Sequence, residues 1–145
     1  MCARKAETLS NGLPLEKNTV LVVDDNANVR AGVRTLLEQA ELSVCGEAYD
    51  GAEAIQKAIE QKPMVIVMDL SMPNLNGAAA ASIIRSLVPN TRIVMFTMFA
   101  DSFGQSMAKH LGVDIVISKT DGSTALIDAI RKCLTPPSQS EKSSN

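Results

Sequence analysis

The sequence predicts an α/β fold in which five helices cover both faces of a doubly wound, five-stranded parallel sheet. Five short apolar segments rich in Val and Ile alternate with five segments of helical periodicity. This alternation is typical of βαβ units, whose right-handed crossovers place helices on both faces of a parallel sheet. The chain has 145 residues and 46% hydrophobic composition, which suit one domain with a full core.

The strands are predicted from short apolar runs with many β-branched residues, bounded by charged or turn-forming residues. The third run is the clearest: it begins after Pro63, reads MVIVM, and ends at a carboxylate, Asp69. Because both faces of a parallel sheet are covered, nearly continuous apolar runs are expected here. In chain order the predicted strands are residues 19–23, 42–48, 64–70, 91–97 and 113–118.

The helices are predicted from apolar residues three or four positions apart, preceded by caps or turns. Asn26 is the expected cap of the first helix. Ile59 in the second helix is expected to face inward, as are Ile83 and Leu87 in the third. The fourth helix is weak because it contains Gly104. In chain order the predicted helices are residues 29–40, 51–59, 77–87, 102–111 and 123–134.

The folded domain is expected to span residues 19–134, between a flexible lead at residues 1–18 and a disordered tail or linker at residues 135–145. A formal net charge of -2 and a pI of about 5.4 argue against direct nucleic-acid contact by this domain. The three cysteines are far apart and form no C-x-x-C pair, which is typical of a reduced compartment. The first residues lack the apolar core expected of a signal peptide, and no apolar run approaches the roughly 18 residues of a membrane span. The sequence therefore predicts a cytoplasmic domain without membrane contact.

Polar residues stand where four of the predicted strands end. Asp24 and Asp25 follow the first strand, Asp69 follows the third, Thr97 ends the fourth and Lys119 follows the fifth. Ligands of doubly wound sheets bind at the carboxyl ends of the strands, so these side chains are expected to share one crevice. Three close carboxylates repel one another, and Mg²⁺, a hard cation with oxygen ligands, relieves that repulsion. A carboxylate beside Mg²⁺ can attack phosphorus, while Lys119 offsets charge on the transferring phosphoryl group.

The order and spacing of these motifs resemble the receiver (CheY-like) domain of two-component response regulators. The matching segments are VLVVDDN, DGAEAI, VIVMDLSMPNLNG, IVMFTMF and VISK, and they cover nearly all of residues 19–134. The resemblance implies a flavodoxin-like strand order, 2-1-3-4-5. It also implies a signalling domain rather than an enzyme, with limited self-phosphorylation and self-dephosphorylation chemistry. Its partner would be a sensor histidine kinase or a phosphotransfer protein.

By this resemblance Asp69 is the phosphoacceptor, Thr97 is the switch hydroxyl and Lys119 pairs with the phosphoryl group. Asp25 would be the more direct metal ligand, with Asp24 acting largely through water. The implied Mg²⁺ ligands are Asp24, Asp25, Asp69 and the backbone carbonyl of Ser71. The implied readout face, which is also the expected surface of a homodimer, is formed by residues 102–111, 113–118 and 123–134.

Three positions depart from the family pattern. Val116 stands where Tyr or Phe is common, so coupling to the readout face is expected to be weaker or to take another route, for which Phe99 and Phe103 are candidates. Thr120 stands where Pro is common, and a trans bond is expected before it because a cis bond without proline costs roughly 2.5–4 kcal/mol. Met98 follows the switch threonine, where a small residue is frequent, and predicts slow self-dephosphorylation.

Two other functions are left open by the sequence. One is a receiver-fold interaction module that works without phosphorylation, because Val116 breaks the usual coupling. The other is a phosphatase with an aspartyl intermediate, but Ser71 stands where haloacid-dehalogenase-type hydrolases carry their general acid. In having a residue other than proline after Lys119, the sequence resembles receiver domains that precede a C-terminal helix-turn-helix domain. Any DNA binding would belong to such a domain, which these residues do not include.

Overall fold

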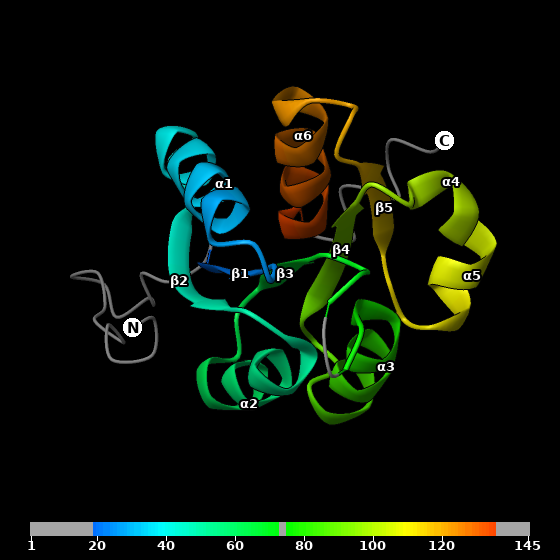
Figure 1. Cartoon of the computed structure of the whole chain (residues 1–145). Coiled ribbons are helices and arrows are strands. Elements are labelled where there is room, and N and C mark those ends of the chain that lie inside the picture. Colours follow the sequence, from blue (N-terminus) through cyan, green and yellow to red (C-terminus); the bar gives the residue numbers. More distant parts are fainter. Residues whose placement is uncertain (1–18, 73–74, 136–145) are drawn as a thin grey trace.

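The computed structural model describes residues 19–72 and 75–135 of the chain, and its centre is a five-stranded parallel sheet (Figure 1). The strand order is β2-β1-β3-β4-β5, which confirms the predicted doubly wound fold and its order. The predicted lead at residues 1–18 lies outside the described residues, as does the predicted tail beyond residue 135. In chain order the strands are β1 (Thr19–Val23), β2 (Ser43–Ala48), β3 (Val65–Met68), β4 (Arg92–Thr97) and β5 (Ile115–Ser118).

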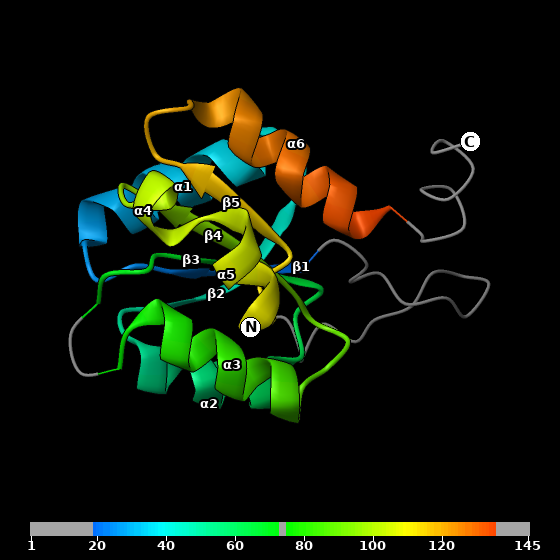
Figure 2. The same ribbon diagram turned by 90° about the vertical axis from the view of Figure 1, so that its right-hand side faces the viewer.

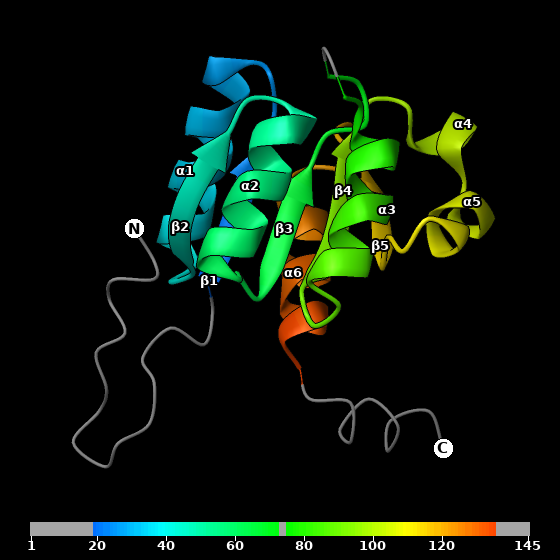
Figure 3. The ribbon, with the colours of Figure 1, turned by 90° about the horizontal axis from the view of Figure 1, so that it is seen from below.

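Helices cover both faces of this sheet. Figure 2 shows α1 and α6 on one face and α2 and α3 on the other, while α4 and α5 lie beside the β5 edge, as Figure 3 also shows. The predicted cap of the first helix is confirmed, because the Asn26 side chain accepts hydrogen bonds from the N–H groups of Asn28 and Val29. The helices are α1 (Ala27–Gln39), α2 (Gly51–Gln61), α3 (Gly77–Leu87), α4 (Ala100–Phe103), α5 (Gln105–His110) and α6 (Ser123–Leu134).

The described residues thus form six helices, where the sequence predicted five. The helix expected over residues 102–111 is divided at Gly104, which has φ 76° and ψ 154°. This backbone conformation lies outside the helical region and is open to glycine alone. The prediction of one continuous helix was therefore wrong, although the glycine had marked the weak point.

The sheet separates two hydrophobic cores, because successive side chains of a strand point to opposite faces. Beneath α2 and α3 the strands contribute Leu21, Val23, Ile66, Met68, Ile93 and Met95, and we call this side the α2–α3 core. Beneath α1 and α6 they contribute Val20, Val22, Val65, Val67 and Val94, and we call this side the α1–α6 core. All of these strand residues are almost inaccessible to solvent.

Three residues predicted to face the core are exposed instead. Ile59, Ile83 and Leu87 are 46%, 39% and 56% exposed, so those predictions were wrong. Alanines occupy the inner faces of the two helices in their place. Small side chains let a helix backbone approach the sheet closely, and the larger residues then lie at the rim. The fully buried alanines are Ala54, Ala58, Ala80 and Ala81.

Strand register brings two acidic residues together at one edge of the sheet. Val23 of β1 pairs with Met68 of β3, so Asp24 and Asp69, which follow them, leave the sheet side by side. The backbone N–H of Asp69 also donates to the carbonyl of Val23 at 3.1 Å.

Among the described residues, no helix is long and apolar enough to cross a bilayer.

Candidate functional site

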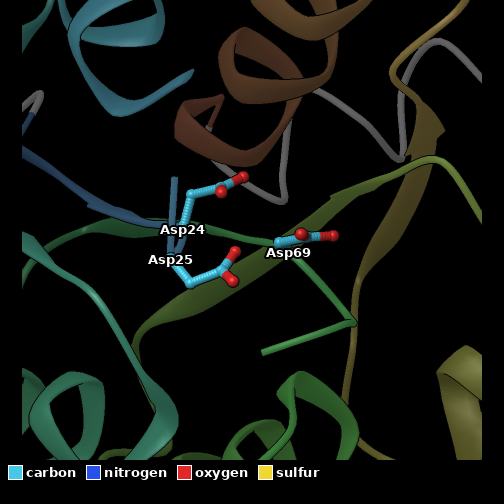
Figure 4. Close-up of side chains that lie close together, drawn as sticks. All are labelled: Asp24, Asp25 and Asp69. Carbon is cyan, nitrogen blue, oxygen red and sulfur yellow. The ribbon is translucent and has the colours of Figure 1, made fainter. Parts of the chain in front are cut away.

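Three carboxylates from two strand ends form a compact cluster (Figure 4). Asp24 and Asp25 come from the turn after β1, and Asp69 comes directly after β3. One carboxylate oxygen of each lies within 4.8 Å of those of the other two. Asp24 and Asp69 are buried, whereas Asp25 is exposed. The structure therefore brings together the three acidic residues that the sequence placed at this edge.

Lys119 reaches the cluster from the end of β5. Its Nζ donates to Oδ2 of Asp24 at 2.7 Å and more weakly to Oδ2 of Asp69 at 3.4 Å. Its side chain is only 16% exposed, so these charges meet with little water between them. One ammonium balances one of three carboxylates, which leaves the site with excess negative charge. Such an excess favours a bound cation.

Thr97 completes the set of predicted side chains. It ends β4 and is fully buried. Its Oγ1 accepts a hydrogen bond from the N–H of Phe99 at 3.1 Å, and its carbonyl accepts one from the N–H of Lys119 at 2.9 Å. Its hydroxyl also acts to lower the pKa of Asp69. Thr97 thus joins the acidic cluster to the start of α4 and to the loop after β5.

Asp69 and Lys119 shift each other's pKa. Burial raises the pKa of Asp69, and the nearby charge of Asp24 adds to this, while the Lys119 ammonium and the Thr97 hydroxyl act in the opposite direction. Burial lowers the pKa of Lys119, but Asp24 and Asp69 together outweigh it and the net shift is upward. Lys119 is therefore a cation throughout the neutral range.

The donor set fits a hard divalent cation such as Mg²⁺. It consists of carboxylate oxygens, with no thiol or imidazole among them, and oxygen ligands are what Mg²⁺ prefers. The Asp25 carboxylate makes no hydrogen bond or ion pair with any other described residue, so its oxygens are free for a ligand. The carbonyl of Ser71, the fourth ligand suggested by sequence, stays a prediction.

Gly77 packs directly against the backbone of Asp69. A Cβ at this position would collide with the carbonyl oxygen of Asp69 and lie 2.9 Å from Cα of Leu70. The N–H of Gly77 donates to the carbonyl of Leu70 at 2.8 Å. The start of α3 therefore closes over the end of β3 and fixes the backbone from which Asp69 projects.

Three residues beside the cluster, Arg30, Arg34 and Glu47, were not predicted from the sequence. Arg30 of α1 donates from Nη1 to the carbonyl of Asp24 at 2.7 Å and from Nε to Oε1 of Glu47 at 3.1 Å. Arg34 donates to the other oxygen of Glu47 at 2.8 Å. Arg34 and Arg30 hold the pKa of Glu47 below its usual value, against the effect of its burial. No spacing rule connects residues 17 positions apart on different elements, so only the fold reveals this network.

The departures from the family pattern lie between β5 and α4. Val116 is buried, and a cavity of about 400 Å³ opens there between small side chains. Its apolar lining comes from Ala100, Gly104 and Val116. Among the described residues no peptide bond is cis, so the bond before Thr120 is trans, as expected. Phe99 is half exposed, and the Phe103 side chain lies outside what the structure describes.

Comparisons with known proteins identify the family to which this chain belongs. The family model described as "Response regulator receiver domain" matches residues 20–131. The response regulator protein VraR of Staphylococcus saprophyticus is 39% identical over 114 residues, which are 78% of this chain and 54% of that protein. VraR of Staphylococcus aureus is 40% identical over the same shares. The chain thus spans about half the length of these curated relatives.

Solved structures give the same result. The response regulator domain of Thermotoga maritima CheB superposes with a TM-score of 0.74 at 35% identity, covering 82% of this chain and 98% of that one. The signal receiver domain of the response regulator NarL from Mycobacterium tuberculosis has a TM-score of 0.76 at 30% identity, covering 82% of this chain and 97% of that one.

Proposed function

This chain belongs to the family of response regulator receiver domains, which function in two-component signalling by phosphorylation of an aspartate, and we propose that its phosphoacceptor is Asp69. The observation that carries the proposal is the cluster itself. Three carboxylates lie within 4.8 Å of one another, and Lys119 bonds to two of them. Asp69 follows the buried third strand at the ligand-binding edge of the sheet.

In the proposed reaction a carboxylate oxygen of Asp69 attacks the phosphorus of a phosphohistidine. The new O–P bond forms as the P–N bond breaks, the electron pair leaves with the imidazole, and an acyl phosphate results. Lys119 neutralises negative charge on the phosphoryl oxygens. The Mg²⁺ held by Asp24, Asp25, Asp69 and the Ser71 carbonyl would supply further neutralisation and alignment.

The hydroxyl of Thr97 is the proposed sensor of the product. The phosphoryl group adds about -1.5 to -2 charges and strong acceptor oxygens, towards which the hydroxyl can turn. Because Thr97 is hydrogen-bonded to Phe99, its movement acts on the start of α4. The face made by α4, α5, β5 and α6 is the proposed readout surface and the proposed surface of a homodimer.

The proposed phosphodonor is a sensor histidine kinase or a phosphotransfer protein, and the proposed compartment is the cytoplasm. VraR is about twice as long as the part matched here. A C-terminal DNA-binding domain is therefore a proposal for the whole protein, and these residues would act as its regulatory half.

A small phosphodonor tests the proposal. The purified chain is incubated with acetyl phosphate and Mg²⁺, and its intact mass is measured. We expect the gain of one phosphoryl group, which is lost in Asp69→Asn and in EDTA. No gain in the wild type, or an equal gain in Asp69→Asn, contradicts the proposal. A chain that gains no phosphate yet binds its partner would support the module that works without phosphorylation.

The phosphatase alternative is distinguished by turnover. A receiver hydrolyses only its own acyl phosphate, so the purified chain is expected to release no phosphate from a phosphomonoester such as p-nitrophenyl phosphate. Multiple turnovers that disappear in Asp69→Asn would favour the hydrolase.

A further inference from the structure

The exposed carboxylate of Asp25 is positioned only through its backbone. It makes no side-chain bond to another described residue, in contrast to Asp24, whose carboxylate accepts from Lys119 and from the N–H of Asn26 at 2.9 Å. A ligand that must meet a small octahedral cation needs a fixed direction. Whatever holds the Asp24–Asp25 peptide therefore fixes the backbone from which the Asp25 carboxylate projects.

Arg30 holds that peptide. Its Nη1 donates at 2.7 Å to the carbonyl of Asp24, which belongs to the peptide bond leading into Asp25. The peptide group is planar, so fixing the carbonyl also fixes the direction of the Asp25 N–H and Cα. On the other side of Asp24, its N–H donates to the carbonyl of Ala48 at 3.1 Å. The segment is thus held by β2 before Asp24 and by Arg30 after it.

The Arg30 guanidinium is itself held in place. Its Nε donates to Oε1 of Glu47 at the end of β2, and its side chain is 18% exposed. The lowered pKa of Glu47 keeps this carboxylate ionised at neutral pH. A charge-assisted bond in a half-buried place restricts the guanidinium more than a water-exposed contact would. Arg30 therefore bridges α1, β2 and the acidic turn.

We propose that Arg30 is a positioning residue for the metal ligands, which orients Asp25 for Mg²⁺ through the Asp24–Asp25 peptide. The inference rests on the proposed function, because it takes Asp25 as a ligand. The direction of the change in Mg²⁺ affinity when Arg30 is removed distinguishes positioning from a purely electrostatic effect. Arg30 is a cation near a cation site, so charge alone predicts tighter Mg²⁺ binding when it is removed. Positioning predicts weaker binding, by about tenfold, as is usual when a group that orients a ligand is lost.

The test is a Mg²⁺ titration of the unphosphorylated chain. Binding is measured by calorimetry and by the NMR chemical shifts of the Asp24 and Asp25 amides. Arg30→Ala is expected to bind Mg²⁺ about tenfold more weakly. Arg30→Lys, which keeps the charge and one donor for the Asp24 carbonyl, is expected to recover part of the loss. Arg34→Ala is the matched control, because it removes the same charge one turn along α1 and leaves the Arg30–Asp24 bond intact; its affinity should stay within about twofold of the wild type.

Each outcome has one meaning. Weaker binding in Arg30→Ala with recovery in Arg30→Lys supports the inference. Unchanged or tighter binding in Arg30→Ala overturns it and leaves the proposed function standing. A wild-type chain that binds no Mg²⁺ overturns the metal site and this inference with it. The amide spectra of residues away from the turn show whether a variant is folded. If Arg30→Ala does not fold, Glu47→Gln replaces it, because this change weakens the bond that holds Arg30 but keeps the bond from Arg30 to Asp24. We expect Glu47→Gln to lower the Mg²⁺ affinity less than tenfold, and an unchanged affinity would count against the inference.

Discussion

Gly77 illustrates, at the scale of one residue, how closely Asp69, the proposed phosphoacceptor, is enclosed. Gly77→Ala places a methyl group against the carbonyl of Asp69, so the end of β3 or the start of α3 must move. We expect a loss of about 1–3 kcal/mol in the free energy of unfolding, as for other overpacked sites. We also expect slower phosphorylation by acetyl phosphate. Gly32→Ala, where a Cβ meets nothing within 4 Å, is the control; equal effects of the two changes would contradict the prediction.

Met98 is a second test at this scale. It follows Thr97 directly, and its side chain is 61% exposed beside the site. If it screens the acyl phosphate from attacking water, Met98→Ala should shorten the phosphate lifetime several-fold. The decay is followed by intact mass after removal of the phosphodonor. Met107→Ala, which truncates an exposed methionine of α5, should leave the lifetime unchanged. An unaltered decay in Met98→Ala would refute the role of Met98.

Cys133 gives a prediction about pH. Burial raises the pKa of its thiol to about 11, from an ordinary value of 9.0. Below pH 9 the thiol is protonated in both folded and unfolded chains, and as pH rises from 9 to 11 only the unfolded chain gains thiolate, so stability falls. Since thiolate is the reactive form, alkylation of Cys133 at pH 8 should be on the order of a hundredfold slower folded than in urea. Peptide mapping measures both alkylation rates. If the alkylation rate of folded Cys133 rises with a midpoint near pH 9, the prediction is wrong.

The ends of the strands could be predicted from the sequence, and with them the place of the acidic residues. Asp24, Asp25 and Asp69 were assigned to one edge from the apolar runs that precede them, and the structure brings them together. The supporting contacts were not predictable in the same way. Arg30 reaches the Asp24 carbonyl through a helix-to-turn contact, and Glu47 joins it from another strand. Such contacts depend on the packing of α1 beside β2, which no local pattern encodes.

At the scale of elements, Gly104 divides what the sequence described as one helix. Its φ of 76° with ψ of 154° is costly for any residue with a Cβ, by about 1–3 kcal/mol, although no neighbouring atom blocks the side chain. Gly104→Ala should therefore either destabilise the domain by that amount or join α4 to α5 as one helix.

Thermal unfolding with far-UV circular dichroism distinguishes these two results of Gly104→Ala. Gly32→Ala in the middle of α1 is again the reference, and it should stabilise the domain by roughly 0.5–1 kcal/mol because the backbone there is helical. If both changes stabilise the domain equally with no gain in helix, the backbone at Gly104 is not strained.

Helix existence was easier to predict than helix orientation. Ile59, Ile83 and Leu87 fall at helical spacing, and hydrophobicity alone assigns them to the core. The alanines of α2 and α3 make a closer fit to the sheet, so the larger side chains lie outward. Periodicity reports which residues share a face, but the packing distance decides which face turns inward.

At the scale of the whole molecule, the sheet divides the interior into two cores that share no side chain. Ile84 belongs to the α2–α3 core and Ile130 to the α1–α6 core, and both are fully buried. Ile→Val at either position should cost about 0.5–1.5 kcal/mol. Because the two sites have no common neighbours, the double variant should show the sum within about 0.5 kcal/mol. Urea unfolding measures all three; a coupling near 1 kcal/mol would mean that strain crosses the sheet.

The bond between Lys119 and Asp24 joins residues 95 positions apart. Asp24 follows β1, the first strand along the chain, whereas Lys119 follows β5, the last strand of the sheet. A nascent chain still lacking β5 in folded form would carry the acidic residues without their cation. The proposed site is therefore complete only after β5 has folded, and a nascent chain that ends before Lys119 should not accept phosphate.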